Sequence, residues 1–350
     1  MFRLSDRFPR PHQAFTKGFY RDEGRDFEVR ILLGHANCGS SDVGEVLAAI
    51  DGIGERDHAG WFAAFRDLGR RLVAVADRSA AAGHRESASW GYLRAATYLA
   101  AAVPVDGSDD DALLPTFREH RRAWDRFVDT THYPVERVAI PFEDTVMPGY
   151  FCRPNADPSP RPTLVMVNGS DGAISSMWAY GGAGALARGY NVLMFDGPGQ
   201  QSMLFERNVG FRPDWEAVLT PVVDFALARP DVDPDRLVAY GISQAGFPLP
   251  RALAFEHRFA AAVADPGVVD VAASWMGHLP AKLRKLYDEG DRNGFDRQMR
   301  IGMRFARATA RVWNFRARPY RRDSYFDTIA EVSRYNLTDV AGSIDTPLLI

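Results

Sequence analysis

Between residues 163 and 265 short apolar runs alternate with segments whose apolar residues recur at helical spacing. The apolar runs are 163–167, 192–196, 236–240 and 259–265, and the helical segments are 178–188, 215–229 and 244–256. Strands that alternate with helices form a parallel sheet, because each helix returns the chain to the same edge. The alternation therefore predicts an α/β fold with a mostly parallel sheet and flanking helices.

The segment before this alternation has a different period. From about residue 15 to 130 apolar residues recur at helical spacing, as in Trp61, Phe65, Leu68, Leu72, Val75, Trp90, Leu93, Tyr98, Leu114, Phe117, Trp124 and Phe127. Ser87 is predicted as a helix N-cap and 106–111 as a loop between helices. A hairpin of strands 137–142 and 147–153 follows. We expect a helical N-terminal cap domain at 1–132 and the sheet domain at 133–350.

A second helical segment interrupts the sheet domain. Residues 271–335 are rich in Arg and aromatic residues and are too long for an ordinary connection, which predicts an inserted helical lid. The sheet resumes at 346–350, where the printed chain stops on an apolar strand. Such an edge is a poor place for a soluble protein to end. We expect the natural chain to continue past Ile350.

The strongest candidate for catalysis is Ser243. It follows the apolar strand 236–240 directly and precedes a helical run, which is the setting of a nucleophile elbow. Small residues flank it at Gly241 and Ala245, where the usual second glycine is replaced by Ala and followed by Gly246. The motif predicts a serine nucleophile, and a serine that caps an ordinary helix is the competing interpretation.

Two further loops follow strands of the predicted sheet. The loop 168–172, Asn-Gly-Ser-Asp-Gly, is expected to form the oxyanion hole with the backbone N–H groups of Ser170 and Gln244, and Asp171 is the next candidate. A simple chain-reversing turn is the alternative. The loop 195–201, Phe-Asp-Gly-Pro-Gly-Gln-Gln, lacks both nucleotide-binding glycine patterns and is expected to be structural.

A serine nucleophile needs a general base and an orienting acid, which in this fold follow the serine along the chain. After Ser243 the only histidines are His257 and His278, at the end of the elbow helix and the start of the insertion. Neither is favoured as the base. The triad acid and His are therefore expected beyond Ile350, with Asp265 as a fallback acid.

Composition excludes several classes of partner. The chain has 42 Lys and Arg against 45 Asp and Glu, a net charge of −3 that attracts neither nucleic acid nor an anionic membrane. The start is charged where a signal peptide is apolar, and Cys38 and Cys152 are expected to be free thiols. Cofactor motifs and metal-ligand spacings are missing from the sequence. We expect a cytoplasmic protein with a small-molecule substrate and no cofactor or metal.

The motifs together resemble a known group, the 2,6-dihydroxypseudooxynicotine hydrolase-like α/β hydrolases, which include fungal enzymes that shorten polyketide precursors. The similarity covers the helical N-terminal region, the loop 195–200, the elbow at Ser243 and the strand 344–350. It implies an α/β-hydrolase fold, a Ser/acid/His triad, a cleft between the helical region and the sheet, a role in secondary metabolism and often a dimer. Gln201 and Ala245 depart from the pattern, which bears on the substrate rather than the chemistry.

Three functions remain open at this point. The leading one is hydrolysis of an ester, an amide or a ketone-adjacent C–C bond through an acyl-enzyme on Ser243. An acyltransferase on the same scaffold, or a catalytically inactive binding protein, are the alternatives. Apolar residues of the insertion are expected mainly as its core, with a pocket lining as the alternative: Trp275, Met276, Leu279, Met299, Met303, Phe305, Trp313 and Phe315. The arginines of 316–322 are expected on a solvated face, the alternative being a site for an anionic substrate group.

Overall fold

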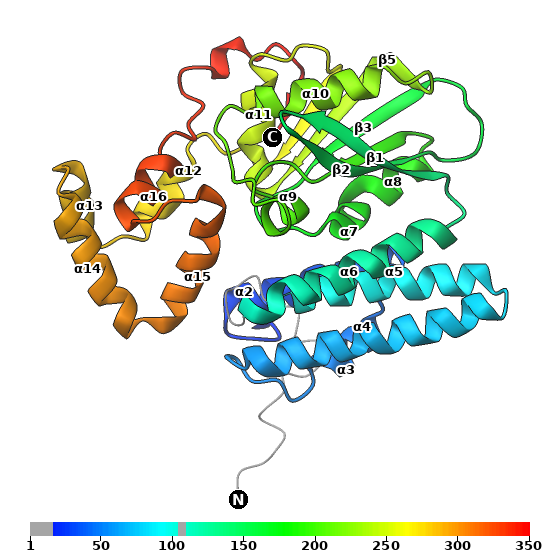
Figure 1. Cartoon of the computed structure of the whole chain (residues 1–350), viewed down its shortest axis with the longest axis horizontal. Helices are drawn as coiled ribbons and strands as arrows, with labels where there is room; N and C mark the ends of the chain where they lie inside the picture. The colour runs from blue at the N-terminus through cyan, green and yellow to red at the C-terminus, as the bar shows by residue number, and fades with distance from the viewer. Residues whose placement is uncertain (1–16, 104–109) are drawn as a thin grey trace, which may run out of the picture. The chain divides into compact units, whose positions relative to one another are not determined.

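The computed structural model describes residues 17–103 and 110–350, which form two compact units (Figure 1). One unit comprises the described residues up to 103 together with 115–131, and the other comprises 110–114 with 132–350. The predicted loop at 106–111 lies outside the described residues except for Asp110 and Asp111, which begin a helix. The predicted boundary between 132 and 133 stays a prediction.

The first unit is helical. Its elements are α2 (Glu23–Gly34), η3 (His35–Cys38), α3 (Val43–Ile50), α4 (His58–Ala81), α5 (Arg85–Ala102) and most of α6 (Asp110–Thr130). Most of the predicted apolar residues of α4 and α5 are buried, whereas Val75 and Trp90 are exposed. Gly69 lets Leu99 approach closely, since a Cβ at Gly69 would lie 2.6 Å from the Leu99 Cγ. The prediction that Ser87 is a helix N-cap is wrong. The N–H of Ala88 already bonds to the His84 carbonyl, so Ser87 lies inside α5.

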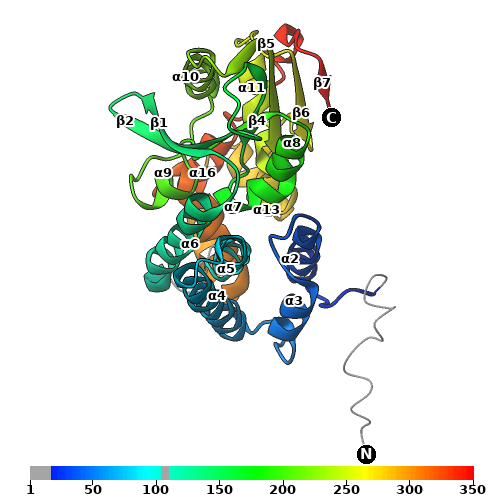
Figure 2. The ribbon, with the colours of Figure 1, turned by 90° about the vertical axis from the view of Figure 1, so that its right-hand side faces the viewer.

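The second unit contains a seven-stranded sheet in the order β1-β2-β4-β3-β5-β6-β7 (Figure 2). The strands are β1 (Val135–Phe142), β2 (Thr145–Cys152), β3 (Arg161–Val167), β4 (Asn191–Phe195), β5 (Val232–Ile242), β6 (Ala261–Asp265) and β7 (Leu348–Leu349). The hairpin β1–β2 joins β4 antiparallel, and all pairs from β4 to β7 are parallel. The predicted mostly parallel sheet is confirmed.

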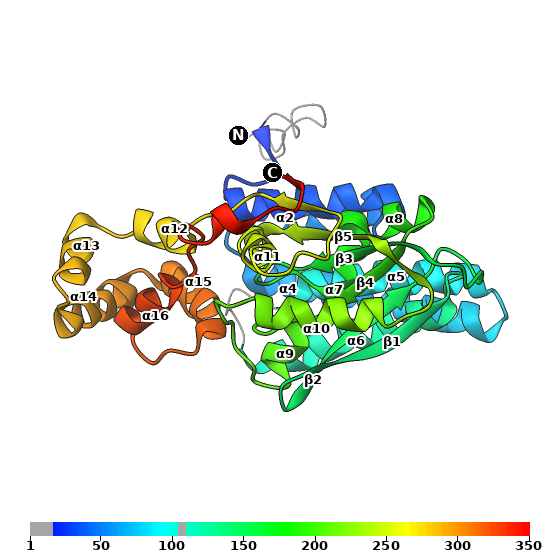
Figure 3. The same ribbon diagram turned by 90° about the horizontal axis from the view of Figure 1, so that it is seen from above.

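Helices cover both faces of the sheet. On one face lie α10 (Glu216–Leu227) and α11 (Pro248–Leu253) (Figure 3). Both share a core with Val165 and Leu193. On the other lie α7 (Ile174–Met177), the π-helical turn η4 (Trp178–Gly182) and α8 (Ala183–Ala187). Gly181 in this turn faces Met166 of β3. Side chains of one strand therefore alternate between two apolar layers, as in any sheet buried on both sides.

The predicted helical insertion is present as α12 (Val271–Gly277), α13 (Ala281–Asp288), α14 (Arg292–Phe305), α15 (Arg307–Ala317), η6 (Arg318–Tyr320) and α16 (Tyr325–Val332). It has its own core, in which Phe295 and Ile329 are fully buried. Leu279, Met299 and Phe315 are buried as expected of core residues, whereas Phe305 is exposed. Arg322 of the arginine cluster pairs with the buried Glu331 at 2.5 Å. Whether the insertion acts as a lid stays a prediction.

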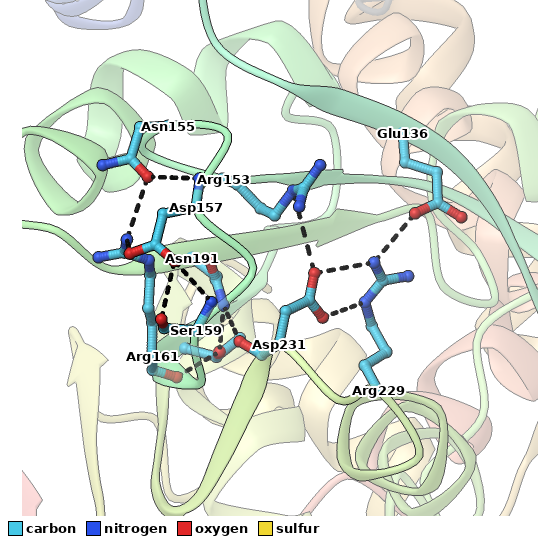
Figure 4. A network of polar contacts seen from close by, with 10 residues as sticks. Glu136, Arg153, Asn155, Asp157, Ser159, Arg161, Asn191, Arg229 and Asp231 are labelled. Carbon is cyan, nitrogen blue, oxygen red and sulfur yellow. Dashed lines mark hydrogen bonds and ion pairs between the residues drawn. The ribbon is translucent and has the colours of Figure 1, made fainter.

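Ion pairs and amide side chains fill the amino edge of the parallel strands (Figure 4). Arg229, at the end of α10, bonds to both Asp231 and Glu136 at 3.0 Å, and its guanidinium lies 3.8 Å from the Phe151 ring centroid. The carbonyl of Asp231 accepts from Asn191 at 2.7 Å. These contacts join the loops before β3, β4 and β5. No helix of the described residues is long and apolar enough to cross a membrane.

Candidate active site

Ser243 lies at the carboxyl edge, immediately after β5. It begins the short 3₁₀ segment η5 (Ser243–Gly246), and its φ of 58° is in the left-handed region that a non-glycine residue rarely adopts. The side chain is exposed. Strain of this kind costs roughly 1 to 3 kcal/mol and concentrates at functional sites. A serine that merely capped a helix would need no such conformation, because N-cap residues have ordinary extended backbone.

Close backbone contacts explain the small residues around Ser243. A Cβ at Gly241 would lie 2.8 Å from the Ala245 carbonyl oxygen, so the strand can turn there only with glycine. Ala245 is fully buried and fits. The tightest position is one residue later, where a Cβ at Gly246 would lie 1.7 Å from the Pro266 carbonyl oxygen. Ala therefore fits at 245, whereas position 246 has no room for a side chain.

The loop 168–172 lies against the serine. A Cβ at Gly169 would lie 3.0 Å from the Ser243 Cβ and 3.4 Å from its Oγ. The N–H of Gly169 donates to Asn168 Oδ1 at 2.9 Å, and Asn168 Nδ2 donates to the Gly172 carbonyl at 2.6 Å. The buried Asn168 side chain thus holds both ends of the loop. The structure brings together Ser243 and the loop that contains Ser170 and Asp171.

Gln200 and Gln201 brace this loop, a role that the sequence interpretation missed. Gln200 is buried, accepts from the Gly197 N–H at 2.8 Å, and donates to the Asn168 carbonyl at 2.7 Å. Gln201 Nε2 donates to the Asp171 carbonyl at 3.1 Å. The loop 195–201 is structural, as predicted, but it acts through glutamine side chains as well as glycine. Two polar residues directly after a glycine-rich turn were the available signal.

Asp265 ends β6, and its backbone pairs with Ile242 next to the elbow. Its carboxylate accepts a hydrogen bond from the Tyr240 hydroxyl at 3.0 Å. Burial, and then this bond, raise the pKa of Tyr240 to about 12, so the phenol remains the donor at neutral pH. Both side chains border an open hollow of about 430 Å³ on the sheet face. Asp265 thus lies at the carboxyl edge of the sheet, as Ser243 does, and one of its carboxylate oxygens accepts the hydrogen bond from Tyr240.

The two histidines after Ser243 have other partners. His257 Nδ1 lies 2.8 Å from Asp345 Oδ1, and His257 precedes β6 at the amino edge, whereas Ser243 follows β5 at the carboxyl edge. The length of a five-residue strand separates these edges by roughly 15 Å. His278 Nδ1 contacts the Ser274 carbonyl at 2.6 Å, at the end of α12. The structure does not bring His257 to the serine.

Curated relatives are named as hydrolases, although no protein-family model matches the chain. The "Hydrolase LUC6" of Fusarium sp. is 33% identical over 279 residues, which cover 77% of this chain and 65% of that protein. The "20-hydroxy-prefusarin hydrolase FUS2" of Gibberella moniliformis is 31% identical over 280 residues, with coverage of 77% and 65%. The chain therefore spans slightly less than two thirds of the length of these relatives.

Solved structures agree on the fold. The 2,6-dihydroxy-pseudo-oxynicotine hydrolase superposes with a TM-score of 0.72 at 20% identity, covering 90% of this chain and 79% of that chain. AbyA5 gives a TM-score of 0.54 at 18% identity, covering 88% and 77%. The predicted α/β-hydrolase fold with a helical N-terminal region is confirmed. The chain is thus similar in sequence to these fungal hydrolases, and it shares the α/β-hydrolase fold of the 2,6-dihydroxy-pseudo-oxynicotine hydrolase.

Proposed function

We propose that this protein is a serine hydrolase that cleaves a carbonyl-containing small molecule through an acyl-enzyme on Ser243. The left-handed backbone of Ser243, exposed beside Gly169, is the observation that carries the proposal. The names of two similar proteins, a 20-hydroxy-prefusarin hydrolase and a 2,6-dihydroxy-pseudo-oxynicotine hydrolase, favour an organic small molecule as the substrate. The bond that we propose is an ester, an amide or a ketone-adjacent C–C bond.

The oxyanion donors in this proposal are the N–H groups of Ser170 and Gln244, with Asp171 as the next candidate. Two observations support the choice. The N–H of Gly169 already donates to the Asn168 side chain, so the next candidate donors along the loop are the N–H groups of Ser170 and Asp171. Gln244 stands in the first turn of η5, where N–H groups have no partner within the helix. A fixed donor of this kind contributes about 3 kcal/mol to the barrier reduction.

The reaction has two halves. Ser243 Oγ attacks the carbonyl carbon while a base takes the hydroxyl proton. The negatively charged oxygen of the tetrahedral intermediate accepts hydrogen bonds from the two N–H groups. Collapse expels the leaving group, which receives that proton, and leaves an acyl-enzyme. Water attacks this ester in the same way, releasing the acid and restoring the serine. In a C–C cleavage the leaving group must carry a carbonyl that stabilises the carbanion.

The base and the orienting acid are the open parts of the mechanism. The prediction that both lie beyond Ile350 stays a prediction, and the intact mass of the natural gene product tests it. Asp265 remains the fallback acid. The lid role of residues 271–335, the homodimer and the cytoplasmic location are likewise predictions.

Labelling with a fluorophosphonate tests the proposal, because only an activated serine is phosphonylated with loss of fluoride. We expect one adduct on the natural gene product and none on Ser243→Ala, whose turnover should fall by roughly 10⁴-fold or more. The unfolding midpoint of the variant should not fall, since Ala keeps the fold. An unlabelled wild-type protein that is folded would instead support the binding-protein alternative.

A further inference from the structure

A hydrogen bond links the residue after the proposed nucleophile to the inserted helices. Gln244 Nε2 donates to the Tyr320 hydroxyl at 3.0 Å, across 76 positions of the chain. Gln244 is one of the two proposed oxyanion donors through its backbone N–H. Through this bond the Gln244 side chain connects the peptide that carries the proposed donor N–H to the inserted helices.

Tyr320 is held rigidly enough to act as such a support. Its side chain is only 4% exposed and packs against three aromatic rings, those of Phe211, Tyr335 and Trp275, with centroids 5.2 to 5.7 Å away. Burial raises the pKa of the Tyr320 hydroxyl, so it stays protonated and neutral at working pH. The Tyr320 hydroxyl oxygen is therefore held at a fixed position, where it accepts the hydrogen bond from Gln244.

The backbone around Tyr320 is joined to the sheet domain as well. The N–H of Phe211 donates to the Pro319 carbonyl at 2.8 Å, and a Cβ at Gly210 would lie 2.5 Å from that oxygen. The Phe211 ring in turn lies directly over Gly199, which has a φ of +79° in the loop that braces Asn168. Both sides of the proposed oxyanion hole are therefore supported from the segment 209–211 and Tyr320.

We infer that Tyr320 is a positioning residue for the proposed oxyanion hole, holding the Gln244 peptide in place through the Gln244 side chain. The inference rests on the proposed function. Tyr320 belongs to η6 of the insertion. Full activity therefore requires that the inserted helices hold Tyr320 in its observed position. Because Tyr320 acts through the Gln244 side chain, loss of its hydroxyl should slow the chemical step and leave initial binding unchanged.

The test is the rate of phosphonylation of the natural gene product by a fluorophosphonate, resolved into reversible binding and the bond-forming step. Tyr320→Phe removes one oxygen and keeps the ring. We expect the bond-forming step to slow about tenfold with binding unchanged, since one donor is loosened rather than removed. Gln244→Leu keeps the backbone N–H and the Tyr320 packing, and it should show the same loss. In the Gln244→Leu background Tyr320→Phe should add nothing.

Tyr335→Phe is the matched control. Tyr335 lies in the same ring cluster, but within the described residues its buried hydroxyl has no hydrogen-bond partner. Its labelling rate should stay within about twofold of wild type. The inference is overturned if Tyr320→Phe also stays within twofold, if its loss adds to that of Gln244→Leu, or if Tyr335→Phe is equally slow. A wild-type protein that is not labelled overturns the proposed function and this inference together, whereas the other results leave the proposed function standing.

Discussion

The two edges of the parallel sheet are built differently. At the amino edge, charged and amide side chains bond to one another, as in the bonds of Arg229 to Asp231 and Glu136 (Figure 4). At the carboxyl edge side-chain bonds such as that of Gln200 to Asn168 are combined with very close approaches at glycines, as where Gly246 meets the Pro266 carbonyl and Gly169 meets Ser243. The amino edge is held by side chains that pair, and the carboxyl edge depends in addition on residues small enough to leave room.

Because of this difference, the two edges should contribute differently to the stability of the protein and to its proposed function. Paired side chains at the amino edge lower the free energy of the folded state. At the carboxyl edge, close backbone approaches and the side-chain bonds of Asn168, Gln200 and Gln244 hold the loops in place, which suits a preorganised oxyanion hole. Substitutions at the amino edge should therefore change unfolding alone, whereas those at the carboxyl edge should also change the rate of reaction of Ser243.

Gly246→Ala should have the largest effect. The added methyl would overlap the Pro266 carbonyl oxygen, at 1.7 Å, so the backbone must shift. We expect a loss of about 3 kcal/mol in the free energy of unfolding, measured by urea denaturation, and slower labelling of the folded fraction. Gly302→Ala in α14 is the control, since nothing lies within 4 Å of its Cβ position. A midpoint that did not move in Gly246→Ala would contradict the crowding argument.

Arg229→Met should separate the edges most clearly. It leaves Asp231, which is 8% exposed, without its closest ion pair, and keeps an apolar stem over Phe151. We expect a loss of about 2 kcal/mol in the free energy of unfolding and an unchanged rate of labelling at Ser243. Arg236→Met removes an exposed ion pair with Asp233 and should not move the midpoint. Slower labelling in Arg229→Met would show that the two edges are coupled.

Gly169→Ala tests the carboxyl edge with a smaller change. Its Cβ would lie 3.0 Å from the Ser243 Cβ and 3.2 Å from the Ile242 carbonyl oxygen, so the loop must move by a few tenths of an ångström. We expect labelling to slow about tenfold, because misplaced donors stabilise the transition state less well. Stopped-flow labelling measures this rate. A large loss of stability with normal labelling of the folded protein is the contrary result.

Asp265→Asn should have the smallest effect. The carboxylate accepts from Tyr240, and Asn keeps an oxygen in the same place. We expect labelling within about threefold of wild type, with Tyr240→Phe as the companion variant. A fall of about 10³-fold or more in Asp265→Asn alone would make Asp265 the triad acid.

Local patterns in the sequence were enough to predict the α/β architecture. Period and apolar composition are properties of short segments, so the hairpin, the parallel strands and the helices of the insertion could be located without any contact information. The nucleophile candidate was found for the same reason, since an elbow is a strand, a serine and a helix in direct succession. The N-cap at Ser87 was wrong because capping depends on where the helix begins, and α5 begins two residues earlier.

Contacts between distant segments were decided only by the tertiary structure. The sequence contains Gln200, Gln244 and Tyr320, but nothing in their neighbours indicates that Gln200 supports Asn168 or that Tyr320 holds Gln244. Gly246 likewise looks like any small residue until Pro266 is seen beside it. The sequence determined which segments are strands and helices and which serine stands at a turn. The partners of that turn depend on packing across the sheet, and packing is a property of the whole unit rather than of any window of residues.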